Sequence, residues 1–415
     1  MSTARQNRHD RPFDVVLFGA TGFTGTLVAH ELARHYDLEW ALAGRNASKL
    51  ETLRADLATK HPGNAALRSL PILVADSADK GRLDEVAAQT RVICTTVGPY
   101  DLLGEPLVAA CVDQGTDYCD LTGETPFIRR MVDTYHDRAV ASGARIVHCC
   151  GFDSIPSDIG TFVLQREALR RFGRPAERVR FHMRKATGGF SGGTVASMLN
   201  MVEQLKDKAV RRIVADPYSL NPEGERSGPD ARDGIKPERD ATTGRWVGPL
   251  VMGPVNTRVV RRSHALRGFP WGKDFRYDEV MSFGRGPSGF AKAVAMSGGL
   301  VGFMAALSVP ALKGLLERRV LPKPGEGPSE KVMRDGFFEA ELVGTAGDHE
   351  IHIKVKGRGD PGYGATSRML AESALALAFD TPQGTLPAGV LTPSTALGEA
   401  LVERLAKTDV TFTVE

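Results

Sequence analysis

The sequence predicts an α/β protein whose N-terminal part forms a parallel sheet flanked by helices. Between Phe13 and Cys150, short β-branched strands alternate with helical patterns, and the first strand runs directly into a glycine-rich turn. At 415 residues the chain is too long for one ordinary hydrophobic core, so we expect two domains.

Composition excludes several classes of protein. With 42% hydrophobic and 25% charged residues the chain is typical of globular proteins, and its net charge of +3 does not favour nucleic-acid binding. The polar start MSTARQNRHDRPFD is not a secretory signal. We therefore expect a cytoplasmic protein. The cysteines have neither zinc spacing nor a disulfide framework, which predicts no metal site and a reducing compartment: Cys94, Cys111, Cys119, Cys149 and Cys150.

The first strand, Phe13 to Phe18, ends in the turn GATGFTG. Gly19 permits a tight turn, Gly22 lets the backbone approach a pyrophosphate, and Gly25 lets the following helix pack closely on the strand. Free N–H groups at the helix N-terminus would meet the phosphate oxygens. The alternative is a turn with only a structural role. The predicted dinucleotide-binding residues here are Gly19, Thr21, Gly22, Phe23, Thr24 and Gly25.

The second strand, Glu39 to Ala43, indicates which dinucleotide is bound. NAD enzymes usually end this strand with a carboxylate that binds the ribose 2′-hydroxyl, but here Arg45 follows, with Ser48 and Lys49 close behind. A guanidinium can grip a 2′-phosphate in two places, so NADP is favoured as the cofactor. Alternatively, Arg45 stacks on adenine without contacting a phosphate.

The remaining predicted strands continue the parallel sheet of the N-terminal domain. A third strand, Leu73 to Ala75, precedes Asp76, which is placed to touch the adenine. A fourth, Arg91 to Val97, runs into Gly98-Pro99-Tyr100 at the carboxyl edge of the sheet, where the ligand crevice of this fold lies. We therefore expect the ribose and nicotinamide to be lined by Thr95, Thr96, Gly98 and Pro99. Two further strands, 117–121 and 145–150, end in Thr122-Gly123-Glu124 and Gly151-Phe152-Asp153-Ser154.

With these motifs the chain resembles the saccharopine dehydrogenase-like oxidoreductases, and most closely their trans-acting enoyl reductase branch, which serves polyketide synthases in actinobacterial lipid assembly. The glycine turn is generic, but the later blocks are not, and they extend over nearly the whole chain. The blocks are FGATGFTG, VGPY, DYCDLTGE, CCGFDSIPSDIG, SGGTVASML, YSLNP, GPLVMGPVNTRVVRRSHAL, GDPGYGAT and GVLTPSTALG.

The resemblance implies a Rossmann domain (residues 1–155) that a C-terminal segment (359–415) completes with helices. Between them it implies an α+β, β-rich substrate or dimerisation domain (156–358). The local patterns agree with this. Alternating strands are predicted at 337–343 and 350–355, helices at 365–378 and around 395–405, and a loop or lid at 223–245.

The resemblance also implies the chemistry: NADPH-dependent reduction of a carbon–carbon double bond in a polyketide or fatty-acyl thioester, which a carrier protein could deliver. In this reaction the enolate oxygen would need hydrogen-bond donors, and the α-carbon would need to receive a proton. The candidate catalytic residues are Tyr100, Asp153 and Ser154.

Each candidate has a structural alternative. Tyr100 could pack beneath the cofactor, and Asp153 and Ser154 could cap a helix that begins near Pro156. Asp120 and Glu124 could form a carboxylate pair or belong to a strand-end turn. Core packing is favoured for the run His148-Cys149-Cys150 because it lies in an apolar segment.

Residues 293–312 contain no charge over about the length needed to cross a bilayer, and Lys292 and Lys313 flank them. The glycines and Pro310 weaken a spanning helix. The alternatives are peripheral membrane contact, a buried helix pair, a dimer face and a surface for an apolar substrate chain.

Two other functions remain open. A saccharopine-type amino-acid dehydrogenase would need basic residues for several carboxylates, which Arg258, Arg261 and Arg262 could supply unless they form a solvated edge. The other is a non-catalytic NADP-binding scaffold at a lipid surface. Exposed strands in the middle domain could also form the interface of a homodimer.

Overall fold

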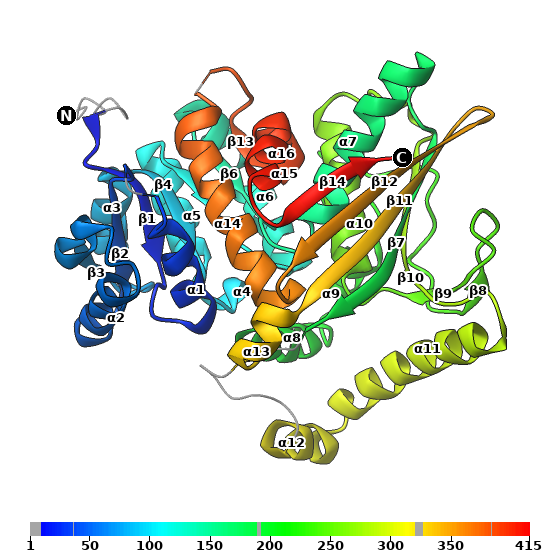
Figure 1. Cartoon of the computed structure of the whole chain (residues 1–415), viewed down its shortest axis with the longest axis horizontal. Coiled ribbons are helices and arrows are strands. Elements are labelled where there is room, and N and C mark those ends of the chain that lie inside the picture. The colour runs from blue at the N-terminus through cyan, green and yellow to red at the C-terminus, as the bar shows by residue number, and fades with distance from the viewer. Residues whose placement is uncertain (1–9, 36, 189–191, 320–326, 383) are drawn as a thin grey trace. The chain divides into compact units, whose positions relative to one another are not determined.

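The computed structural model describes residues 10–35, 37–188, 192–319, 327–382 and 384–415 (Figure 1). The polar residues 1–9 lie outside this set. The chain forms two compact units, and each is built from discontinuous parts of the sequence. The first unit comprises 1–152 and 363–408, and the second comprises 153–362 and 409–415.

The first unit is a seven-stranded sheet in the order β3-β2-β1-β4-β5-β6-β13, in which all paired strands are parallel. Its strands are β1 (Phe13–Phe18), β2 (Trp40–Gly44), β3 (Ile72–Val74), β4 (Thr90–Thr95), β5 (Asp117–Cys119), β6 (Arg145–Val147) and β13 (Gly389–Leu391). Its helices are α1 (Phe23–Leu32), α2 (Ala47–Lys60), α3 (Lys80–Ala88), α4 (Tyr100–Leu103), α5 (Glu105–Gln114), α6 (Thr125–Ser142), α14 (Thr366–Leu375), α15 (Pro393–Ala396) and α16 (Gly398–Ala406). This is the Rossmann arrangement that the sequence predicts.

Strand β1 lies at the centre because it is apolar on both faces. Val15, Val16 and Leu17 are fully buried, as expected for a parallel strand covered by helices on both sides. It pairs with β2 on one side and β4 on the other, so the strand order reverses across it. In open α/β sheets the ligand crevice forms at such a reversal, outside the carboxyl ends of the strands.

The C-terminal return to this sheet is held by a buried ion pair. Arg145, at the start of β6, binds Asp117 of β5 and also donates to the carbonyl oxygens of Leu377 and Thr381, in the segment that follows α14. Strand β13 then adds to β6, with Val390 opposite Ile146. The sheet therefore needs residues from both ends of the chain.

The second unit contains a mixed sheet in the order β14-β12-β11-β7-β10-β9-β8. Its strands are β7 (Arg178–Thr187), β8 (Glu238–Arg239), β9 (Trp246–Pro249), β10 (Arg276–Ser282), β11 (Phe337–Ala346), β12 (His349–Arg358) and β14 (Val410–Val414). Its helices are α7 (Ile155–Phe172), α8 (Gly192–Gln204), α9 (Lys208–Ala215), α10 (Gly253–Leu266), α11 (Pro287–Ser308), α12 (Pro310–Arg319) and α13 (Glu330–Asp335). Helices α7 and α10 pack against each other and on the sheet.

The last strand differs from the sequence expectation, which places all of 359–415 with the Rossmann domain. Strand β14 instead pairs antiparallel with β12 of the second sheet, with Val414 opposite Ile353. The reason is its alternating pattern, VTFTV, which suits an edge strand with one face on a core. The predicted fifth and sixth strands are also shorter than expected, since they end at Cys119 and Val147.

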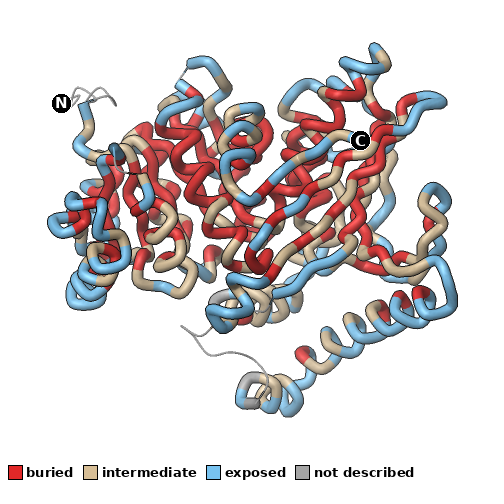
Figure 2. Tube along the Cα trace, viewed as in Figure 1, coloured by how far each residue is buried: buried red, intermediate tan, exposed pale blue. Residues whose placement is uncertain are grey.

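Helices α11 and α12 contain the uncharged stretch 293–312, and they are mostly exposed (Figure 2). Helix α11 begins against β9, where Phe290 packs on Trp246 with ring centroids 4.7 Å apart. Beyond this contact Val294, Val301 and Met304 face solvent. By length and composition α11 could cross a membrane. The expectation of a buried helix pair is therefore wrong for this unit.

Candidate functional site

The glycine turn after β1 is shaped by close contacts that leave no room for a side chain at Gly19 or Gly25. Gly19 has φ +82°, and a Cβ there would lie 2.5 Å from Cγ2 of Val97. A Cβ on Gly25 would lie 2.2 Å from the carbonyl oxygen of Gly19, which also accepts a hydrogen bond of 3.2 Å from the Thr96 hydroxyl. The turn, the start of α1 and the end of β4 are thereby packed together.

This turn fits the diphosphate of a dinucleotide. Helix α1 begins after Gly22, and among the described residues no side chain caps its first turn, which also contains no acidic residue. Its free N–H groups therefore favour an anion. Thr21 and Thr24 are half-buried within the turn. The Phe23 ring packs edge-on against Tyr363, with centroids 5.1 Å apart, so Phe23 anchors the C-terminal segment to the turn.

The carboxyl end of β2 carries the residues expected to contact a 2′-phosphate. Arg45, Ser48 and Lys49 are all exposed at the start of α2. Asn46 caps this helix: its Oδ1 accepts from the Lys49 N–H at 3.0 Å and from the Ser48 hydroxyl at 2.9 Å. No carboxylate in the described part of the chain pairs with Arg45. The guanidinium is therefore free to bind an anion.

Asp76 follows β3 and is exposed. One of its carboxylate oxygens accepts from the Ala78 N–H at 2.9 Å, which stabilises the turn leading to α3. Asp76 therefore lies at the carboxyl end of β3, and its contact with the adenine stays a prediction.

At the end of β4 the turn Thr95 to Pro99 leads into the short helix α4. Thr95 is buried, and its Oγ1 accepts from the Val97 N–H at 3.3 Å. Gly98 is exposed and Pro99 is half-buried. Beyond them, the carboxylate of Glu124 accepts from the Tyr100 N–H at 3.0 Å and from the Asp101 N–H at 2.9 Å. Glu124 therefore holds the start of α4 in place.

The Tyr100 side chain points into the protein. It is 4% exposed, and its hydroxyl donates to the carbonyl oxygen of Thr95 at 3.3 Å. Burial, reinforced by the nearby carboxylate of Asp120, raises the pKa of Tyr100 well above its usual value. These contacts favour the packing alternative for Tyr100 over proton donation.

Asp120 serves as a buried hydrogen-bond acceptor. Its Oδ2 accepts from the Tyr118 hydroxyl at 2.9 Å and lies 2.7 Å from Nδ1 of His148, while its Oδ1 accepts from the N–H groups of Thr122 and Cys149. Asp120 thus links the turns that follow β5 and β6. Together with the helix contact of Glu124, this supports the strand-end alternative over a catalytic carboxylate pair.

The pairing of Asp120 with His148 was not expected from the sequence. His148 is 2% exposed and follows β6 rather than lying inside it, and within the described structure its Nε2 has no hydrogen-bond partner. Its ring contacts those of Tyr118 and Phe127, with centroids 5.8 and 5.4 Å away. The available signal was that both residues directly follow neighbouring parallel strands.

Asp153 and Ser154 lie just before α7, and their roles differ from helix capping. Ser154 occupies the N-cap position, but its hydroxyl donates to Oδ1 of Asn256 at 3.1 Å instead of capping the helix. Asp153 keeps part of its surface in contact with solvent, yet burial raises its pKa to about 6. Asp153 can therefore hold a proton at higher pH than an ordinary carboxyl group.

The hydrogen bond from Ser154 continues through a buried polar network in the second unit. Asn256 donates its Nδ2 to Glu279 at 2.9 Å, and the Tyr277 hydroxyl donates to the same carboxylate at 2.7 Å. Burial raises the pKa of Glu279 to about 7. The sequence gives no local sign of this network, because its members lie just before α7, on α10 and on β10, which are far apart in the chain.

The three arginines of α10 have a role that neither sequence alternative described. They are neither exposed nor free, with exposures of 1% for Arg258, 4% for Arg261 and 1% for Arg262. Arg258 binds Asp233, Arg261 binds Asp230, and Arg262 donates to the carbonyl oxygen of Leu220. They anchor the loop that follows α9, since a buried guanidinium needs such partners.

Within the described residues, no group of histidine, cysteine and acidic side chains could hold a metal ion. All five cysteines are buried.

Comparison with known proteins agrees with this geometry. Residues 15–147 match the family described as the saccharopine dehydrogenase NADP binding domain. The chain is 42% identical over 411 residues to a provisionally named trans-acting enoyl reductase of Mycobacterium tuberculosis H37Rv, covering 95% of this chain and 96% of that protein. It is 38% identical over 416 residues to a trans-acting enoyl reductase of Mycobacterium ulcerans, with coverages of 96% and 97%.

Among solved structures, the apo form of saccharopine dehydrogenase (L-Glu forming) from Saccharomyces cerevisiae has a TM-score of 0.54 over 97% of this chain and 99% of that chain. At 13% identity this is a likeness of fold. The sequence identity to the mycobacterial proteins, in contrast, extends over nearly the full length of both chains. This protein therefore belongs to the trans-acting enoyl reductase family of saccharopine dehydrogenase-like proteins, and it is an NADP-dependent oxidoreductase.

Proposed function

We propose that this protein uses NADPH to reduce the carbon–carbon double bond of an enoyl thioester, of polyketide or fatty-acyl type, in trans with a lipid or polyketide synthase. The observation that carries the proposal is the 38–42% identity, over almost the entire chain, to proteins named for this activity. The free arginine at the end of β2 supports NADPH as the cofactor rather than NADH.

We propose that the diphosphate binds the turn from Gly19 to Gly25 and that the 2′-phosphate binds Arg45, Ser48 and Lys49. Asp76 would contact the adenine, and residues Thr95 to Pro99 would contact the ribose and the nicotinamide. When bound, the nicotinamide supplies the hydride that adds to the β-carbon of the enoyl group. The protein must then stabilise negative charge on the thioester oxygen and deliver a proton to the α-carbon.

Asp153 is the best candidate for the proton donor. It directly follows the residues at the carboxyl end of β6, and its raised pKa keeps a larger fraction protonated near neutral pH than for an ordinary carboxyl group. Ser154, whose hydroxyl is held by Asn256, would position the neighbouring backbone rather than transfer a proton. Tyr100 would stabilise the turn that follows β4 through its hydrogen bond to the carbonyl oxygen of Thr95.

The saccharopine-type alternative is less well supported. It depended on Arg258, Arg261 and Arg262 as a binding site for substrate carboxylates, but all three are buried against partners in the second unit. The exposed apolar surface of α11 and α12 is better suited to a lipidic substrate or to a membrane. We propose a cytoplasmic enzyme that contacts the membrane peripherally.

The test is NADPH oxidation by the purified protein with trans-2-enoyl thioesters of increasing chain length, on coenzyme A and on a carrier protein, with the product followed by mass spectrometry. Formation of the saturated acyl product supports the proposal. If NADPH binds but no enoyl thioester is reduced, the assignment fails. Turnover of 2-oxo acids with amino acids would then favour the saccharopine-type reaction, and no turnover at all would favour the scaffold.

A further inference from the structure

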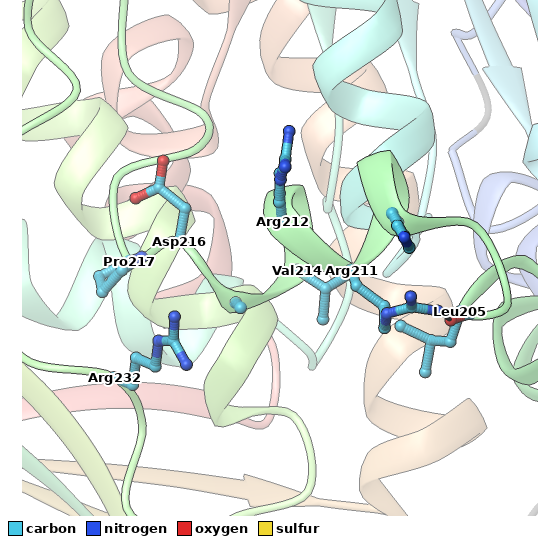
Figure 3. A pocket seen from close by; sticks show the side chains of 9 residues that line it. Leu205, Arg211, Arg212, Val214, Asp216, Pro217 and Arg232 are labelled. Atoms are coloured by element: carbon cyan, nitrogen blue, oxygen red, sulfur yellow. Dashed lines mark hydrogen bonds between the residues drawn. The ribbon is translucent and has the colours of Figure 1, made fainter.

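The second unit contains an open surface pocket of about 790 Å³ that none of the predicted site residues line (Figure 3). Its size is typical of small-molecule sites, which span roughly 300 to 1,000 Å³. It lies between helix α9 and the loops on either side of it. The lining residues are Leu205, Lys208, Arg211, Arg212, Val214, Ala215, Asp216, Pro217 and Arg232.

The charge of this lining favours an anion, because the lining contains four cationic side chains and one carboxylate. Lys208, Arg212 and Arg232 have no acidic partner in the described parts of the chain. Arg211 donates to the carbonyl oxygens of Leu205 and Lys206, so its charge is not neutralised either. Figure 3 shows Arg211 and Arg212 extending in different directions from α9, with Arg232 coming from the later loop.

The lining also contains aliphatic side chains, so a ligand with an apolar group next to its anion would contact both kinds of residue. The aliphatic residues of the lining are Leu205, Val214 and Pro217. A free inorganic anion would make no use of these side chains. A phosphate ester next to a branched aliphatic carbon would contact both parts of the lining at once.

The buried arginines of α10 hold this pocket in shape. Arg258 donates to the carbonyl oxygen of Val214 at 2.8 Å and binds the carboxylate of Asp233, next to Arg232, at 2.5 Å. Arg261 donates to the carbonyl oxygen of Pro217 at 3.1 Å. Both sides of the pocket are thus tied to one helix, which reduces the entropy lost when a ligand is bound.

We propose that this pocket binds the phosphate and adjoining dimethyl carbon of the phosphopantetheine arm that carries the thioester substrate. The inference rests on the proposed function, because coenzyme A and carrier proteins both present an acyl group on this arm. The phosphate would lie among Lys208, Arg212 and Arg232, and the geminal methyl groups would lie against Leu205 and Val214. The pocket would then recognise the carrier arm independently of the acyl chain.

The test compares the wild-type protein with the double variant Arg212→Gln/Arg232→Gln, using one enoyl group on four carriers. Two of these, N-acetylcysteamine and pantetheine, lack the phosphate, and two, phosphopantetheine and coenzyme A, contain it. We expect KM to rise at least about tenfold for the two phosphorylated substrates, with kcat and the KM of the other two unchanged. The difference in KM between the variant and the wild type should become smaller as the salt concentration is raised. Equal effects on all four substrates, or on none, would overturn the proposal.

Arg239→Gln is the matched control, since Arg239 is an exposed arginine of the same unit that does not line the pocket. An acylated carrier protein distinguishes the source of the phosphate. If the KM of the double variant rises for the acyl carrier protein as well as for acyl coenzyme A, the pocket recognises the arm that both carriers share. If the KM rises only for the coenzyme A and phosphopantetheine thioesters, the pocket recognises the free cofactor.

Calorimetric binding of unacylated phosphopantetheine separates this inference from the proposed function. If wild-type protein binds it and the double variant does not, the pocket is a phosphate site even when no enoyl thioester is reduced. If wild-type protein reduces enoyl thioesters but binds phosphopantetheine no better than the variant, the inference fails and the function stands.

Discussion

The glycines of the first turn serve two separable purposes. A Cβ on Gly25 would meet the carbonyl oxygen of Gly19 at 2.2 Å, whereas a Cβ on Gly22 would meet only that same oxygen at 3.3 Å. Gly22 also has φ −73°, which any residue can adopt. Packing therefore requires glycine at position 25, whereas contacts within the protein do not require it at position 22.

We predict that Gly25→Ala destabilises the first unit by about 1–3 kcal/mol through overpacking, while Gly22→Ala leaves thermal unfolding almost unchanged. Gly22→Ala should weaken NADPH binding at least about tenfold, because the new methyl group would stand where the diphosphate approaches. Thermal unfolding and NADPH titration by fluorescence distinguish the two effects. Unchanged NADPH affinity in Gly22→Ala would argue against diphosphate binding at this turn.

Asp153 should make the reaction dependent on pH. If its protonated form delivers the proton, kcat should fall as the pH rises through about 6, where this carboxyl group ionises. Asp153→Asn should lower kcat by about a hundredfold and remove this pH dependence. Ser154→Ala, which removes only the hydrogen bond to Asn256, should retain it. Identical pH profiles for wild type and Asp153→Asn would exclude Asp153 as the donor.

At the scale of elements, α11 is unusual because its apolar side chains face solvent. Val294 and Val301 are 43% and 53% exposed and lie seven residues apart, on one side of the helix. The exposed Lys292 precedes them and Lys313 follows, so an anionic lipid surface would contact both the apolar and the basic groups.

We predict that the wild-type protein cosediments with vesicles containing anionic lipid and that Val294→Asp/Val301→Asp lowers this partitioning about a hundredfold. Transfer of each valine into the membrane should contribute about 1.5 kcal/mol, and tenfold in partitioning corresponds to about 1.4 kcal/mol. Val332→Asp, which changes an exposed valine of α13, is the matched control. Equal vesicle binding by both variants would exclude α11 as the membrane contact.

For the whole molecule, Glu279 should couple the stability of the second unit to pH. Because burial raises its pKa in the folded protein from an ordinary value of 4.5 to about 7, the folded state binds more protons than the unfolded state between these values. The free energy of unfolding should therefore fall as the pH rises across this interval, by about 3 kcal/mol, and change no further above it.

Glu279→Gln has no such proton to lose, so we expect its stability to vary less between pH 5 and pH 8 than that of the wild type. Hydrogen exchange of peptides from 153–362 measures the second unit separately from the first. Glu330→Gln, an exposed residue of α13, should behave as the wild type does. A wild-type protein whose second unit is equally stable at both pH values would contradict the prediction.

The sequence by itself determined the Rossmann sheet and its glycine turn, because both depend on local patterns: buried β-branched strands, glycines at fixed spacing and amphipathic helices. It also indicated the cofactor, through the basic residues after β2. Only the tertiary structure decided the roles of residues whose partners are distant in the chain. His148 pairs with Asp120, the α10 arginines brace the pocket beside α9, and Glu279 meets Asn256 and Tyr277. The burial and charge balance of such residues depend on three-dimensional neighbours, and residue spacing along the chain does not contain that information.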